Sequence, residues 1–441
     1  MSDRQPMGLP SLLRRLNTAD VLREIRSNGP VSRANVAKGT GLSQLTVNQI
    51  ANRLLRAGHV IEEGGDARSR PSRRGRRTRL LRFNAAGGHV LGIDIAAAAV
   101  VVVVADLDGK IVSQERRPVR TRAQLHPTPF LSLVRTTIQA ALAAARVPRS
   151  SLMAAGIGVP GRVDPRSGRI SLVPALSGWN GLMIGNRLAG SLRCPIVVEN
   201  DVHLAILAER GFGSAKAEDN AVYLHVGVGI GLGILVKGEL YRGAAGAAGE
   251  IAFLPVCEAD DPPEGDFGTF ECAAGSTAFA RLGRSAAASS PGGVIYGLAA
   301  GDLDRIDAHV VVEAAGQVGA SARPIPERVA KQLARSISAV HRILDPGIII
   351  LGGEVTQANS LLLERLKELI SVMTPRPLGK IVISSLGDEA VALGAVQVAL
   401  RQVEERLFEV RPRTTLPNDS EHRDGSRHGL RSQAGSTRGM K

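Results

Sequence analysis

Residues 30–59 read PVSRANVAKGTGLSQLTVNQIANRLLRAGH, and this stretch predicts a helix-turn-helix. Ser32 is placed to cap a short helix that ends near Lys38, and Gly41 provides the turn, where a residue without Cβ has the lowest steric cost. Ser43 is placed to cap a second helix. That helix has one apolar face, because apolar residues recur in it at helical spacing: Val47, Ile50, Ala51, Leu54 and Leu55.

The opposite face of the second helix carries polar side chains that suit the edges of DNA bases. Amide and guanidinium groups pair bidentately with adenine and guanine in the major groove. We therefore expect this face to contact double-stranded operator DNA, although a helical hairpin with a solvated polar face has the same pattern. The expected contacts are Ser43, Gln44, Thr46, Asn48, Gln49, Asn52 and Arg53.

A wing follows the two helices. Residues 60–63 and 78–83 have the composition of paired strands, and the segment between them is rich in Arg, Gly and Pro. The pattern predicts a winged helix-turn-helix domain over residues 11–84. Arginines around such turns enter narrow minor grooves, whereas a disordered basic linker would touch phosphates only. The wing residues expected at DNA are Arg73, Arg74, Arg76 and Arg77.

The positive charge of the chain is concentrated at its ends. The 441 residues carry a formal net charge of +14 at pH 7. Residues 1–86 hold 17 Lys and Arg against 6 Asp and Glu, residues 411–441 hold 7 against 3, and the middle is close to neutral. A basic segment of this kind is expected for phosphate contacts and counterion release. The charge supports DNA binding by the N-terminal domain, and it predicts a basic disordered tail over residues 411–441.

The composition excludes several classes of protein. Apolar residues make up 44% of the chain, enough for a core, yet no run of 18 apolar residues predicts a membrane span. The N-terminus has no signal-peptide pattern. The three cysteines, Cys194, Cys257 and Cys272, are not at metal-ligand spacing. We therefore expect a cytoplasmic protein of two or three domains, with no membrane partner, no metal and no cofactor.

Residues 87–410 have the pattern of an α/β body. A second run of strands, at 221–226 and 231–236, repeats the start of the first, and short glycine hairpins occur in both at Asp108-Gly109 and Lys237-Gly238. This repeat predicts a duplicated fold with a ligand-binding cleft between two lobes. The first half contains strand patterns at 89–94, 100–105, 111–117 and 153–159, and an amphipathic helix at 127–146.

Six separated segments of the body carry a family pattern. They are 156–161 (GIGVPG), 198–201 (VEND), 227–233 (GVGIGLG), 241–250 (YRGAAGAAGE), 344–353 (LDPGIIILGG) and 386–395 (LGDEAVALGA). In this order they resemble the ROK family (repressors, open reading frames, kinases), and with the winged helix the resemblance covers about residues 18–405. It implies a two-lobed, actin-like and hexokinase-like fold of the ribonuclease H-like class, with the second lobe from about residue 200, in a homodimer or homotetramer.

The family has a kinase branch, whose members hold the ATP phosphates with two hairpins. Glycine lets the backbone approach the phosphates, and a threonine hydroxyl donates to them. Here the first hairpin keeps Asp94 but has Ala96 and Ala98 where the family pattern has glycine and threonine. The second reads Gly227-Val228-Gly229, again without the threonine. The resemblance therefore implies a degraded phosphate site without ATP turnover or a catalytic residue, although a kinase that uses other donors remains open.

The sugar-binding side of the family pattern is better retained. Asn200 and Asp201 match the family's sugar-contacting pair, in which the aspartate deprotonates the attacked hydroxyl in kinases. Glu250 matches the first residue of the Glu-x-Gly-His motif, and Glu271 matches the glutamate after the zinc segment. Carboxylates and an amide suit a polyhydroxylated ligand, since they accept from and donate to vicinal hydroxyls. The resemblance thus implies a small sugar-like effector bound by these four residues.

The zinc site of the family is not retained. Its histidine position, three residues after Glu250, holds Phe253. The segment 262–269, which is rich in cysteine in the family, has none. Structural zinc sites need three or four Cys or His ligands, so no metal is expected.

We therefore expect a transcriptional repressor of the ROK type, whose winged helix binds an operator and whose body senses a sugar or sugar derivative. In the expected mechanism the ligand closes the cleft, and the spacing of the two winged helices in a dimer changes. The alternative is an ATP-dependent sugar kinase of the glucokinase type, against which residues 94–98 argue. A third possibility is a DNA-binding protein whose body serves dimerisation only, which Phe253 and the missing zinc ligands favour.

Overall fold

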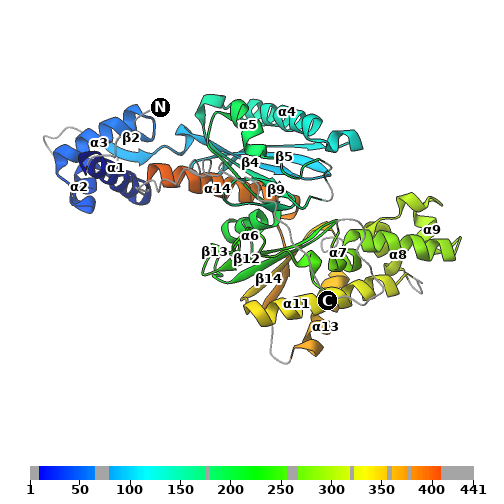
Figure 1. Cartoon of the computed structure of the whole chain (residues 1–441). Helices are drawn as coiled ribbons and strands as arrows, with labels where there is room; N and C mark the ends of the chain where they lie inside the picture. Colours follow the sequence, from blue (N-terminus) through cyan, green and yellow to red (C-terminus); the bar gives the residue numbers. More distant parts are fainter. Residues whose placement is uncertain are drawn as a thin grey trace, which may run out of the picture.

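The computed structural model describes residues 9–64, 79–173, 176, 178–255, 267–317, 322–354, 360–374 and 379–408. Within these ranges the chain forms a small N-terminal domain and a body of two α/β lobes (Figure 1). None of the described helices is long and apolar enough to cross a membrane. The N-terminal domain consists of α1 (Leu9–Asn28), β1 (Val31–Ser32), α2 (Arg33–Thr40), α3 (Gln44–Arg56), β2 (Val60–Gly64) and β3 (Arg79–Phe83).

The helix-turn-helix lies where the sequence predicts it. The Ser32 hydroxyl accepts a hydrogen bond from the backbone N–H of Asn35 at 3.2 Å and caps α2. Gly41 ends α2 with a φ of +69°, in the left-handed region that favours glycine. The Ser43 hydroxyl accepts from the backbone N–H of Thr46 at 3.1 Å and caps α3. Local sequence signals therefore set both helix starts and the turn.

Helix α1 and the three-stranded sheet complete the domain. The strands lie in the antiparallel order β1-β3-β2, with Val60 opposite Phe83. The connection from β2 to β3 falls outside the described residues, and the predicted wing contacts Arg73, Arg74, Arg76 and Arg77 lie in it. The three helices share one apolar core of buried side chains: Val21, Leu22, Ile25, Val36, Val47, Ile50 and Leu54.

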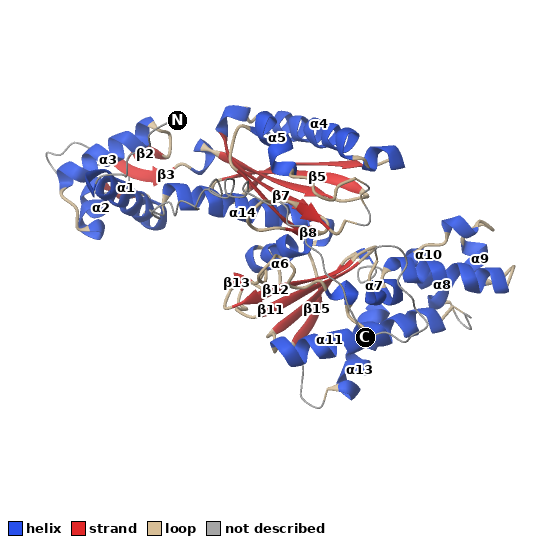
Figure 2. Ribbon diagram, in the orientation of Figure 1, coloured by secondary structure: helices blue, strands red, loops and turns tan. Residues whose placement is uncertain are grey.

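The first lobe is a five-stranded sheet in the order β10-β7-β4-β5-β6. β4, β5 and β6 are antiparallel, and β7 and β10 add to β4 in parallel. Helices α4 and α5 cover one face, and α14 (Ala390–Leu407) covers the other (Figure 2). The elements are β4 (His89–Ile95), β5 (Ala99–Asp106), β6 (Ile111–Pro118), α4 (Pro127–Ala145), β7 (Leu152–Val159), β8 (Arg162–Val163), β9 (Ile170–Ser171), α5 (Ile184–Leu192) and β10 (Ile196–Asn200).

The second lobe repeats this arrangement in the order β13-β12-β11-β14-β15, again three antiparallel strands followed by two parallel ones. The predicted internal repeat is therefore a duplicated fold. Helix α6 covers one face, and α11 and α13 pack on the other. The elements are α6 (Asp201–Gly211), β11 (Ala221–Val226), β12 (Ile230–Val236), β13 (Glu239–Leu240), α7 (Thr269–Ala274), α8 (Ser276–Ser289), α9 (Val294–Leu298), α10 (Ala308–Gly316), α11 (Pro324–Leu344), β14 (Ile348–Gly352), α13 (Ser360–Met373) and β15 (Lys380–Ile383).

Helix α14 joins the parts of the molecule, because it packs on β4 and β7 of the first lobe and on α6 of the second. Glycines permit this close approach. A Cβ on Gly92 would lie 2.1 Å from the carbonyl oxygen of Ala392, and a Cβ on Gly394 would lie 1.9 Å from that of Leu204. The C-terminal end of α14 reaches the N-terminal domain. The last helix therefore contacts all three parts of the chain.

Candidate functional site

A cavity of about 350 Å³ lies in the cleft between the two lobes. The first lobe contributes the turns after β4 and β7, and the second contributes the start of α6 and the β11–β12 hairpin. This volume is in the range of small-molecule sites. Among the predicted cleft residues, Asp94 does not line the cavity but is buried near the end of β4. The predicted residues that do line it are Ala96, Ala98, Asn200, Asp201, Gly227, Gly229, Glu250 and Glu271.

The side chain of Asn200 is fixed by the fold. Its Oδ1 accepts from the backbone N–H of His203 at 3.0 Å, which caps α6, and its Nδ2 donates to the carbonyl oxygen of Gly161 at 2.9 Å. An asparagine is the kind of residue that a helix start favours in this position. The amide therefore spans the two lobes at the edge of the cavity, with part of its hydrogen-bonding capacity already used.

Asp201 is the first residue of α6, and one of its carboxylate oxygens accepts from the backbone N–H of Val202 at 2.8 Å. Burial raises the pKa of Asp201 to about 6, and the nearby charge of Glu250 adds to this effect. The pKa of Glu250 is also raised, chiefly by burial. Both carboxyls therefore lack the full solvation they would have in water and are available to hydroxyl donors of a ligand.

Glu271 lies on α7 and is held at the mouth of the second glycine hairpin. One oxygen accepts from the backbone N–H of Ile230 at 2.9 Å, and the other accepts from that of Gly268 at 3.3 Å. Burial raises its pKa, and the charge of Glu250 raises it further. The carboxyls predicted from sequence thus come from distant segments and meet in one cavity.

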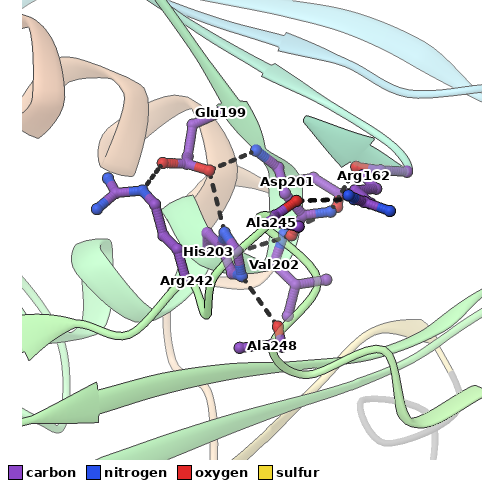
Figure 3. A network of polar contacts seen from close by, with 10 residues as sticks. Arg162, Glu199, Asp201, Val202, His203, Arg242, Ala245 and Ala248 are labelled. Carbon is purple, nitrogen blue, oxygen red and sulfur yellow. Dashed lines mark hydrogen bonds and ion pairs between the residues drawn. The ribbon is translucent and has the colours of Figure 1, made fainter. Parts of the chain in front are cut away.

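A buried ion network behind the cavity was not predicted from sequence (Figure 3). The His203 Nδ1 donates to a carboxylate oxygen of Glu199 at 3.0 Å, and the Arg242 Nε donates to the other. Burial alone would raise the pKa of Glu199, but the hydrogen bonds and charges of His203 and Arg242 together lower it. The His203 Nε2 lies 3.3 Å from the carbonyl oxygen of Ala248. This network fixes the loop that carries Glu250 to the start of α6.

The spacing of Glu199 and His203 was the only local signal of this network. The two residues are four apart, but they straddle the junction between β10 and α6, where helical spacing does not apply at the sequence level. Arg242 lies 43 positions from Glu199, so only the fold brings the pair together.

The opposite side of the cavity is formed by the two hairpins that resemble a phosphate cradle. The Ala96 N–H donates to the carbonyl oxygen of Ala99 at 3.1 Å, and the Gly227 N–H donates to that of Gly229 at 3.0 Å. His225, which sequence reasoning missed, also lines the cavity, and burial lowers its pKa to about 4. The imidazole is therefore neutral near pH 7.

Comparison with known proteins places this cleft in a family. The model of the ROK family matches residues 90–402. The chain belongs to the ROK family. It is 27% identical over 398 residues to a xylose repressor of Caldicellulosiruptor bescii, a match that covers 89% of this chain and 98% of the repressor. It is 28% identical over 323 residues to a glucokinase of Thermotoga maritima, which covers 71% of this chain and 98% of the glucokinase.

Solved structures give the same fold. A ROK family transcriptional regulator described as a homologue of the E. coli MLC protein has a TM-score of 0.69 at 22% identity, over 90% of this chain and 98% of that chain. The repressor and regulator matches are long enough to include the helix-turn-helix as well as the body. The glucokinase match has about the length of the ROK domain. The chain is thus a ROK protein with the organisation of the family's regulators.

The positions of the family zinc site hold no metal ligands that the structure describes. Phe253 lines the cavity with a half-exposed ring. Cys257 lies outside the described residues, and Cys272 is buried on α7. Within the described ranges, no three His, Cys, Asp or Glu side chains are grouped so that they could hold a metal ion.

The predicted DNA face of this ROK protein lies on α3. Gln44, Gln49, Asn52 and Arg53 are exposed. Ser43 and Thr46 are partly committed to the helix cap, with their hydroxyls 2.8 Å apart. Asn48 accepts from Arg33 at 3.4 Å, and that arginine also pairs with Glu62 at 2.7 Å.

An exposed apolar residue that sequence reasoning passed over lies on the same face. Leu45 is 69% exposed, and it falls on one helical stripe with Asn48, Gln49 and Asn52. An apolar side chain among amides suits the C5-methyl group of thymine in the major groove. The face therefore offers both polar and apolar contacts to bases.

Proposed function

We propose that this protein is a DNA-binding transcriptional repressor whose ROK body senses a sugar. The observation that carries the proposal is the whole-length likeness to a xylose repressor, which extends over a helix-turn-helix and a cleft lined by carboxylates. The basic N-terminal segment supplies the phosphate contacts. In this proposal α3 enters the major groove, and the predicted polar residues of its exposed face, with the arginines of residues 73–77, contact the operator.

The proposed effector site consists of Asn200, Asp201, Glu250 and Glu271. Their carboxylates accept from vicinal hydroxyls, and such charge-assisted hydrogen bonds are stronger than neutral ones. Asp201 occupies the position of the base in ROK kinases. In this proposal it holds a hydroxyl of the sugar without transferring a phosphoryl group to it.

Loss of ATP turnover is part of the same proposal. Ala96 and Ala98 add methyl groups where the kinase pattern has glycine and a hydroxyl, and Val228 replaces a second hydroxyl. The likeness to a glucokinase keeps an ATP-dependent sugar kinase as the second candidate. An assay of ATP-dependent phosphorylation over a panel of hexoses and xylose decides between them, since turnover of any sugar would support the kinase.

Signal transfer is proposed to run along α14. Asp388, just before this helix, lines the cavity. At the other end, the Arg26 guanidinium of α1 donates to Glu404 at 2.8 Å and lies between the rings of Phe83 and Phe408, 5.2 and 5.3 Å from their centroids. A movement of the lobes around the ligand would therefore displace one end of a rigid helix whose other end holds the winged helix.

The proposed assembly is a homodimer or homotetramer on a pseudo-palindromic operator. Two copies of α3 would then read half-sites about one or two helical turns apart. A coupling free energy of about 1–3 kcal/mol between sugar and DNA suffices for a usable switch.

The test is an electrophoretic mobility shift on DNA selected from a random library by this protein, at a stated salt concentration. We expect a sequence-specific shift that at least one sugar weakens. A shift that no sugar alters would leave a DNA-binding protein whose body serves assembly only. Equal binding to all sequences, lost at moderate salt, would overturn operator recognition.

A further inference from the structure

The charges that line the cavity are of one sign. Among the described lining residues there is no lysine and no arginine. Five of them are carboxylates: Asp201, Glu250, Glu271, Glu354 and Asp388. An anionic ligand would therefore enter a site with five acidic neighbours and no cation.

The nearest arginines are committed elsewhere. Arg242 pairs with buried Glu199. The Arg162 Nε donates to the carbonyl oxygen of Ala245 at 2.8 Å, and Arg116 pairs with Asp388 at 2.7 Å. These contacts hold their guanidinium groups to the walls of the cleft.

Backbone donors, which hold phosphate in many sites without any cation, are also engaged at the key positions. The Gly227 N–H donates within its own hairpin, and the Ile230 N–H donates to Glu271. The start of α6, where a helix attracts anions, already holds the carboxylate of Asp201 on the Val202 N–H. The two histidines of the lining do not replace these donors, because His203 is bonded to Glu199 and His225 is neutral near pH 7.

We propose that the cavity accepts an uncharged or amine-bearing sugar as its effector and excludes sugar phosphates. The proposal rests on the proposed function and names the chemical class of the ligand. Neutral hydroxyls donate to the carboxylates, and an ammonium group is attracted by them. A phosphate ester meets like charges instead, which cost several kcal/mol at short range.

The test compares matched ligands that differ only in charge. D-glucose, D-glucosamine and D-glucose 6-phosphate form one set, and N-acetylglucosamine and its 6-phosphate form a second, with D-xylose as a further neutral sugar. Isothermal titration calorimetry at pH 8 keeps Asp201 ionised. We expect each phosphate ester to bind at least about tenfold more weakly than its parent sugar, and the difference to shrink as salt is raised.

A charge-reversal variant identifies the cause. Glu354 is exposed at the rim of the cavity, so Glu354→Lys removes an acid and adds a cation without disturbing the core. We expect this variant to narrow the difference between phosphate ester and parent sugar by roughly tenfold, about 1.4 kcal/mol. Glu313→Lys on α10, an exposed position that does not line the cavity, changes net charge equally and should leave the difference as it is.

Two results separate the failure of this inference from the failure of the proposed function. A phosphate ester that binds the wild-type protein as tightly as its parent sugar, or more tightly, overturns the inference and leaves the sensing function intact. Silence of every sugar in a protein that still binds its selected DNA overturns the sensing function, and the inference with it.

Discussion

At Asp201 a carboxyl is held in the cleft at a cost to the folded state. Its pKa is about 6, raised by burial from a value of 3.8. From pH 3.8 to 6 the folded protein therefore binds more protons than the unfolded chain, so the free energy of unfolding falls as the pH rises through this window. Above pH 6 the loss is complete. A group that costs stability and lies in a ligand cavity is typical of a functional site.

Asp201→Asn separates these two roles. We expect it to raise the free energy of unfolding at pH 7.5 by on the order of 2 kcal/mol, with a gain that shrinks as the pH falls from 6 toward 4. The same change should weaken sugar binding by roughly tenfold or more, because an ionised acceptor is lost. Urea unfolding at several pH values and calorimetry measure both effects, and exposed Asp304→Asn is the control. A variant that binds sugar normally would contradict the assignment of Asp201.

Leu45 gives a second prediction at this scale. If its side chain contacts a thymine methyl, Leu45→Ala should weaken binding to the selected operator by roughly tenfold. Deoxyuridine in place of the contacted thymine should weaken the wild-type protein similarly and add little to the variant. Val372→Ala, at a position that is 87% exposed on α13, is the matched control. Equal losses on deoxyuridine DNA for both proteins would place Leu45 away from the methyl group.

Among the elements, the predicted boundaries that agree best with the structure are those with a local cause. α2 and α3 start at capping serines, and Gly41 closes α2 where a left-handed backbone is needed. Helix α1 was not predicted, because it has no comparable start signal and its buried residues are held by packing against α2 and α3. The strands of the body were predicted because apolar runs between glycine turns are local features as well.

Removal of the α3 cap tests how far local signals support function. Ser43→Ala deprives the Thr46 N–H of its acceptor, and we expect a loss of about 1 kcal/mol of stability, with weaker DNA binding. Ser43→Asn keeps a capping oxygen and should retain most of the stability. Thermal unfolding of the full chain, together with mobility shifts, measures both. A fully stable Ser43→Ala protein would show that tertiary packing alone fixes α3.

For the whole molecule, the question is whether α14 transmits the state of the cleft. Arg26→Met keeps an apolar stem but removes the contacts of the guanidinium with Glu404, Phe83 and Phe408. We expect the variant to bind both its operator and sugar, while the sugar changes DNA affinity by less than in the wild type.

The measurement is the mobility shift of Arg26→Met with and without saturating sugar. Arg166→Met, an exposed position in the turn between β8 and β9, is the control and should keep the full response. An undiminished response in Arg26→Met would exclude the α14 contact as the route of coupling.

The sequence by itself determined the helix-turn-helix, the duplicated α/β body and the identity of the cleft residues, because caps, turns and periodicity are encoded within a few neighbouring positions. Only the tertiary structure decided that Arg242 and His203 share Glu199, that α14 returns to the first lobe, and that the cleft contains carboxylates without a described cation. These features join residues far apart in the chain. Their partners are chosen by the packing of the two lobes, which no local pattern specifies.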